Sequence, residues 1–178
     1  MFEEYLQDAS LFVDLAHQSA ADGDEKVARR YYRVSVFCLA GAIESFVNYV
    51  ADSFAQADQL PLNEIAFLND EKFTPEKGKL VRRAEFHRLE DKLKILLTRF
   101  IPDFDFQGTM WIWFMELKDL RDSLIHPRRL EDEVPLAQYS TKLIRSMSAI
   151  VGLMDCLLKA IFNKHLRKQI LDLKPDVR

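Results

Sequence analysis

The sequence predicts an all-α fold, an up-and-down bundle of about five helices in a single domain spanning residues 1–178. Leu and Ala contribute 24 and 15 residues, against 10 Val and 4 Thr, a composition that favours helices over strands. Gly and Pro, with 5 and 6 residues, are scarcer than in an average domain. Apolar residues also recur at three- and four-residue steps through most of the chain.

The N-terminal third predicts two helices. Residues 3–21 place apolar side chains at helical spacing, and Asp22-Gly23-Asp24 ends this helix and can cap the next one. Residues 25–58 contain no Pro and a single Gly, and apolar residues occupy nearly every face between Val34 and Val50. We therefore expect this second helix to be the central and most buried one.

The middle of the chain predicts a connection and then a surface helix. Residues 59–74 are rich in Pro, Asn and Asp around a short apolar piece, which suits a loop with about one helical turn. Thr74-Pro75 is typical of a helix N-terminus, with Thr as the cap and Pro at the first helical position. The charged segment from there to Phe100 carries a thin apolar stripe, so we expect a helix with one buried edge.

Two further helices are predicted in the C-terminal half. After Gly108-Thr109, apolar residues at helical spacing predict a core helix that stops at Pro127. Pro135 opens a last long helix, after which residues 164–178 form a polar tail that is expected to fray. The core of the domain then covers about residues 25–163, and short connections favour antiparallel neighbours.

Charge and residue usage restrict the class of protein. The formal net charge of −3 argues against a broad basic surface for nucleic acid. The N-terminus reads Met-Phe-Glu-Glu, which is not a secretory signal, and Glu44, Ser45 and Asn48 interrupt the longest apolar stretch, so no membrane association is expected. Cys38 and Cys156 read as two buried thiols without metal-ligand spacing. We expect a cytoplasmic protein with no metal and no cofactor.

One constellation carries the chemical interest of the sequence, because the glycine-rich phosphate loop, HExxH, GxSxG and paired-cysteine motifs are all absent. It is the segment Leu120-Arg121-Asp122-Ser123-Leu124-Ile125-His126-Pro127-Arg128-Arg129. Asp122 and His126 are four apart and share a helix face, so the carboxylate can orient the imidazole. Pro127 disfavours a helical conformation at His126, which is therefore expected to leave the helix and turn toward Arg121. An Arg, a His and two further cations can then surround a phosphate.

At these residues the chain resembles the HEPN superfamily, the helical "higher eukaryotes and prokaryotes nucleotide-binding" domains. Their motif is Arg, a polar residue and then His near a helix end, and Arg121-Asp122-Ser123-Leu124-Ile125-His126 fits its four-residue form. The segment from Phe37 to Tyr49 also looks like the core helix that precedes the motif helix in such domains. A second match, Arg82 to His87, is rejected because it lies in a charged segment without a terminating proline.

The resemblance implies a metal-independent endoribonuclease whose two motifs meet across a homodimer. The ribose 2′-hydroxyl would attack the adjacent phosphorus and leave a 2′,3′-cyclic phosphate. His126 would transfer protons, Arg121 would neutralise the phosphorane, and Asp122 would orient the histidine. Arg128 and Arg129 would bind the substrate. The resemblance also implies a separately encoded antitoxin or regulatory partner.

Other functional interpretations stay open. The same fold can serve as a non-catalytic module that holds a nucleotide, RNA or a partner protein, or as a purely structural subunit. Glu44 and Asn48 are four apart on the helix expected to be most buried, so Glu44 is interpreted either as supporting Arg121 or His126, or as half of a core ion pair or dimer contact. The cations between Lys77 and Lys94 alternate with acids, which favours a solvated face over an RNA track.

Overall fold

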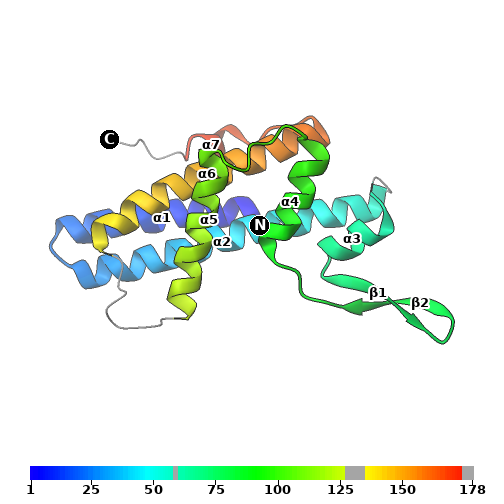
Figure 1. Ribbon diagram of the computed structural model, residues 1–178. Helices are drawn as coiled ribbons and strands as arrows, with labels where there is room; N and C mark the ends of the chain where they lie inside the picture. Colours follow the sequence, from blue (N-terminus) through cyan, green and yellow to red (C-terminus); the bar gives the residue numbers. More distant parts are fainter. Residues whose placement is uncertain (58–59, 127–134, 174–178) are drawn as a thin grey trace. The chain divides into compact units, whose positions relative to one another are not determined.

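The computed structural model describes residues 1–57, 60–126 and 135–173, without the side chains of 55–57. These ranges contain seven helices and one two-stranded antiparallel sheet (Figure 1). The prediction of a mostly helical chain is confirmed, while the small sheet departs from the all-α expectation. The chain divides into two compact units, Met1–Ile43 with Asp105–Arg178 and Glu44–Phe104, which are described in turn.

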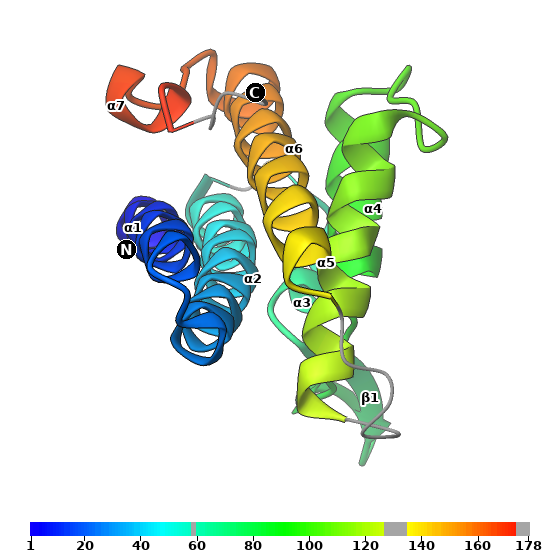
Figure 2. The ribbon, with the colours of Figure 1, turned by 90° about the vertical axis from the view of Figure 1, so that its left-hand side faces the viewer.

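The first unit consists of helices. They are α1 (Phe2–Ala21), the first part of α2 (Glu25–Ala57), α5 (Thr109–Ile125), α6 (Leu136–Phe162) and the short α7 (Lys168–Leu171). The sequence predicts all of these helices except α7. Figure 2 shows α1 alongside the beginning of α2, and α5 alongside α6. Pro135 is the N-cap of α6, as its position in the sequence predicts.

Two buried serines join the helices of this unit in pairs. Ser35 on α2 donates its hydroxyl to the carbonyl oxygen of Ala9 on α1 at 2.9 Å. Ser146 on α6 donates in the same way to the carbonyl of Trp113 on α5 at 3.1 Å. Both serines are fully buried, and these bonds satisfy hydroxyl groups that would otherwise destabilise the core. Apolar side chains of all four long helices are buried as well.

The second unit contains the remainder of α2, α3 (Leu62–Leu68), β1 (Glu71–Glu76), β2 (Lys79–Ala84) and α4 (Leu89–Phe100). The single helical turn or so predicted within residues 59–74 is present as α3. Phe54 on α2 stacks on Phe100 of α4, with ring centroids 5.1 Å apart, and Leu93, Leu96 and Leu97 on α4 are fully buried. The apolar stripe predicted for the charged segment therefore exists in its C-terminal half.

The predicted helix from Thr74-Pro75 to Phe100 is wrong over its first half, which forms the β1–β2 hairpin. Lys77 and Gly78 both have positive φ, +48° and +77°, and make the two-residue turn between Glu76 and Lys79. The two strands pair in antiparallel register from Glu71 with Ala84 to Glu76 with Lys79, and in β2 only Val81 is half-buried while its neighbours are exposed. Thr74-Pro75 lies inside β1 and pairs with Leu80-Val81.

Helix α2 is less uniformly buried than its apolar sequence predicts. It buries one side, including Leu39, Ile43 and Phe46, whereas Val34, Phe37 and Tyr49 are exposed. By its length and composition, Glu25–Phe54 is long and apolar enough to cross a membrane, and 56% of an apolar 18-residue stretch within it is buried inside the molecule. The core helix of a soluble protein can be equally long and apolar, so the length and composition of α2 do not themselves indicate a membrane.

Two smaller expectations need correction in the first unit. Cys38 is only half-buried and Cys156 is exposed, because both face away from the apolar side of their helices. Residues 164–178 are not simply a polar tail, since Leu166 and Ile170 are buried. The Asp155 carboxylate accepts a hydrogen bond from the Leu166 N–H at 2.8 Å and thereby holds the start of this segment on α6. Residues 174–178 lie outside the described part of the chain.

Candidate functional site

The C-terminal end of α5 is where the sequence places the candidate site. The helix ends at Ile125, and His126 leaves it with φ −123° and ψ 66°. The His126 N–H still donates to the carbonyl of Asp122 at 2.9 Å, which closes the last helical turn. The expectation that His126 departs from the helix is confirmed, and its cause is the steric restriction that Pro127 imposes on the preceding residue.

Asp122 holds the neighbouring arginine. Its Oδ1 accepts hydrogen bonds from Nε and Nη2 of Arg121 at 3.1 and 2.9 Å, and its Oδ2 lies 3.8 Å from Nζ of Lys118, one turn earlier. The side chains of Arg121 and Asp122 are 31% and 42% exposed, so this ion pair lies at the surface within reach of a solute. The carboxylate therefore sits between two cations.

The predicted contact between Asp122 and His126 is not among the hydrogen bonds of the described residues. The adjacent guanidinium takes up Oδ1, and the imidazole of His126 is exposed to solvent. Asp122 thus orients Arg121 in this structure. Arg128 and Arg129, the two cations predicted to bind substrate, lie outside the described residues.

Glu44 and Asn48 do not have the surroundings that the sequence predicts. Both are exposed, so the expectation that Glu44 is a buried carboxylate in need of a partner is wrong. The reason is the narrow apolar side of α2, where Ile43, Phe46 and Val47 point inward while Glu44 and Asn48 lie on the opposite side. Both belong to the second unit, whereas Arg121 and His126 belong to the first. A supporting role for them stays a prediction.

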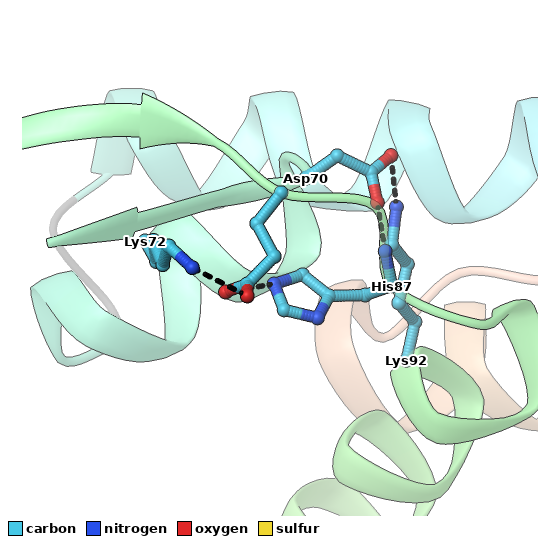
Figure 3. Close-up of polar contacts among 5 residues, drawn as sticks. Asp70, Lys72, His87 and Lys92 are labelled. Atoms are coloured by element: carbon cyan, nitrogen blue, oxygen red, sulfur yellow. Dashed lines mark hydrogen bonds and ion pairs between the residues drawn. The ribbon is translucent and has the colours of Figure 1, made fainter.

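A polar cluster that the sequence does not predict lies at the base of the hairpin (Figure 3). The Asp70 carboxylate accepts hydrogen bonds from the backbone N–H of His87 at 2.8 Å and from Nζ of Lys92 at 2.6 Å. Lys72 donates to Oε1 of Glu85 at 2.8 Å, and Oε2 of Glu85 lies 3.8 Å from Nε2 of His87. Lys92 is only 5% exposed, so its charge depends on Asp70 for compensation. The cluster ties the hairpin to α4.

The carboxylates of this cluster have lowered pKa values. Burial raises the pKa of Asp70, but the hydrogen bonds from Lys92 and the His87 N–H, together with the charge of Lys92, hold it below its ordinary value of 3.8. The hydrogen bond from Lys72 is the main reason that the pKa of Glu85 lies below its ordinary value of 4.5. Both groups are therefore ionised at neutral pH, as a structural ion-pair network requires.

The rejected second copy of the motif falls in this unit. Arg82 lies in β2 and His87 in the segment that follows, so the two are not on a helix, although a helix was predicted for this charged segment. Arg82 and Arg83 form ion pairs with Glu71 and Glu76, at 3.4 and 2.6 Å. The preferred interpretation of this segment, a charged surface laced with ion pairs, agrees with these contacts.

A surface cavity of about 550 Å³ also lies in the second unit. It is lined by Glu64 of α3 and by Lys94, Ile95, Thr98 and Arg99 of α4. Both signs of charge line it, and none of the residues predicted for catalysis does. Within the described ranges, no group of three or more His, Cys, Asp or Glu side chains is placed to hold a metal ion.

Comparisons of the chain with protein-family models, with curated proteins and with solved structures found no match.

Proposed function

We propose that this protein is a metal-independent endoribonuclease of the HEPN type whose site is completed across a homodimer. The observation that carries the proposal is the end of α5, where His126 leaves the helix with its imidazole exposed, five residues after an arginine that a carboxylate holds at the surface. An imidazole can both accept and donate a proton in general acid–base catalysis. The guanidinium can neutralise charge on a phosphate.

In the proposed reaction, one His126 removes the proton of a ribose 2′-hydroxyl. The 2′-oxygen bonds to the adjacent phosphorus, and the bond from phosphorus to the 5′-oxygen breaks. The leaving 5′-oxygen takes a proton from the second subunit's imidazole, so that the products are a 2′,3′-cyclic phosphate and a 5′-hydroxyl. Arg121 stabilises the extra negative charge of the pentacoordinate intermediate, with Asp122 fixing the orientation of its guanidinium.

One observation favours the alternative, a non-catalytic module of the same kind that binds a nucleotide, RNA or a partner protein. Asp122 contacts Arg121 and Lys118, and no described carboxylate orients the imidazole of His126. A catalytic histidine is usually oriented by such a partner. A surface arginine held by a carboxylate suits the binding of a phosphate equally well.

Cleavage of end-labelled RNA in the presence of EDTA separates the two functions. We expect the wild-type chain to release cyclic-phosphate products, and His126→Ala to lose about 100-fold or more of the rate, the range for a general acid or base. Arg121→Ala should also be strongly impaired, with Arg121→Lys retaining part of the activity through its charge. His17→Ala, which alters another exposed histidine, serves as the matched control.

Undiminished cleavage by His126→Ala would refute the assignment. RNA retention without cutting by the wild-type chain would favour the binding module. If the chain neither cuts nor binds RNA or a nucleotide, the structural subunit becomes the better interpretation.

A further inference from the structure

The hairpin of the second unit has two chemically different faces. Residues that pair across the hairpin, such as Phe73 with Arg82 and Thr74 with Val81, lie on the same face. Successive residues along each strand lie on opposite faces. One face carries Phe73, Pro75, Leu80 and Ala84, with Arg82 lying over the Phe73 ring at 5.6 Å and paired with Glu71. We call these four residues the apolar face. The other face is mainly charged; its residues are Lys72, Thr74, Glu76, Lys79, Val81 and Arg83.

The apolar face is open to solvent. Leu80 is 69% exposed, Pro75 and Ala84 are exposed, and Phe73 is half-buried. Phe86, which is 82% exposed, follows directly after Glu85, whose N–H extends the strand pairing by donating to the Asp70 carbonyl at 2.8 Å. A two-stranded hairpin is marginally stable alone, and exposed apolar side chains concentrated on one face are typical of an interaction surface.

The backbone of β2 is available for pairing. The sheet contains only β1 and β2 among the described residues, and β1 contacts α3. Alternate residues of β2 therefore direct their N–H and C=O groups away from β1, where an added strand can bond to them. The corresponding edge of β1 includes Pro75, which has no N–H to donate. The open edge of β2 is thus the better template.

The charge of the hairpin indicates the chemistry of its partner. Residues 71–88 contain six Lys and Arg and three Glu, a net charge of +3 in a chain whose total is −3. The three Glu are already paired with Lys72, Arg82 and Arg83. Among the described residues no ion pair engages Lys77 or Lys79 at the turn. A partner therefore meets uncompensated positive charge on the charged face and aliphatic side chains on the other.

We infer that the β2 edge binds an extended segment of a partner protein in which apolar and acidic residues alternate. Added as a third strand, such a segment places its apolar side chains beside Leu80 and Ala84 and its carboxylates on the charged face, beside Lys79. The pattern favours a protein segment over RNA, because most cations of the hairpin already have acidic partners and few remain for phosphates. Two hairpins pairing with each other would bring together two net charges of +3.

The test uses a fluorescently labelled ten-residue peptide of alternating Val and Glu, with binding to the full chain followed by anisotropy. We expect saturable binding that a Leu80→Ser/Phe86→Ser variant weakens about tenfold or more. Lys79→Glu should weaken it as well. Leu11→Ser makes the same kind of change at a 53% exposed leucine on α1 and should leave the binding unchanged.

Two further probes test the mode of binding. A peptide methylated at alternate backbone nitrogens cannot pair with a strand edge and should bind at least about tenfold more weakly, and an alternating Val and Lys peptide should not bind. Failure of the Val and Glu peptide to bind, or equal binding by the hairpin variant, would overturn the inference. So would an oligouridine that binds the wild type and displaces the peptide, since the surface would then serve RNA.

Discussion

The carboxylate of Asp122 accepts both of its short hydrogen bonds from the guanidinium of Arg121, and this contact decides what the end of α5 can do. The guanidinium is adjacent in sequence and flexible enough to reach Oδ1. The imidazole of His126 belongs to a residue that has left the helix, so the i to i+4 spacing no longer brings it to the carboxylate. The result is a positioned cation and, five residues later in the chain, an exposed imidazole.

Replacing Asp122 by Asn should lower RNA cleavage by less than about tenfold. An ion pair this exposed contributes only up to about 1 kcal/mol, which limits the loss when the charge is removed. Asp119→Asn removes the same charge from the same helix three residues earlier and should leave the rate unchanged. Single-turnover rates of the two variants and of His126→Ala provide the measurement. If Asp122→Asn proved as inactive as His126→Ala, the carboxylate would have to act through the histidine.

Among the elements, the long helices follow directly from local sequence, and the hairpin does not. Helices α1, α5 and α6 begin and end at residues that the sequence marks, such as Pro135 and the residue before Pro127. The hairpin contains Pro75 after a Thr and several Lys and Glu, residues that also suit a helix start and a helix surface. Gly78 between two short alternating segments was the available signal for a turn.

Gly41→Ala should stabilise α2. A Cβ at this position would lie 3.7 Å from the ring of Tyr5, an ordinary contact, and Ala is favoured over Gly in a helix by about 0.5–1 kcal/mol. Urea unfolding should show the gain. At Gly152 a Cβ would lie 2.9 Å from Cε of Met110, so the end of that flexible side chain must move and Gly152→Ala should gain less. A less stable Gly41→Ala would mean that Gly41 is needed for close packing with another helix or chain.

For the molecule as a whole, the second unit combines an apolar core with a polar cluster that joins the hairpin to α4. The side chains of Leu93, Leu96 and Leu97 are fully buried, and Lys92, beside them in sequence, is buried with its charge. The Asp70 carboxylate forms an ion pair with Lys92, and its Oδ2 lies 2.6 Å from Nζ. The unit therefore depends on an ionised carboxylate for part of its stability.

Acid should destabilise the protein partly through this cluster. A carboxylate whose pKa is lower in the folded than in the unfolded state contributes stability above its unfolded pKa, and this is lost as the pH falls through the lower folded value. For Asp70 and Glu85 the loss should begin below about pH 5 and continue below their ordinary values of 3.8 and 4.5.

Urea midpoints at pH 6 and pH 3 measure this dependence. Asp70→Asn should lose about 1–3 kcal/mol at pH 6, less than for a fully buried pair because the Asp70 side chain is 42% exposed, and should show a smaller further loss at pH 3. Asp52→Asn removes an exposed carboxylate of the same unit as a control. An acid dependence in Asp70→Asn as steep as in the wild type would contradict the role given to the cluster.

The sequence by itself determined the helical class, the bounds of the long helices and the departure of His126 from α5. These depend on interactions between residues a few positions apart, such as apolar periodicity, caps and the restriction before Pro127. Tertiary structure alone decided that Glu44 is exposed, that Lys92 is buried beside Asp70, and that residues 71–84 pair as strands. Burial and strand pairing depend on partners distant in sequence or across a turn, which local patterns do not specify.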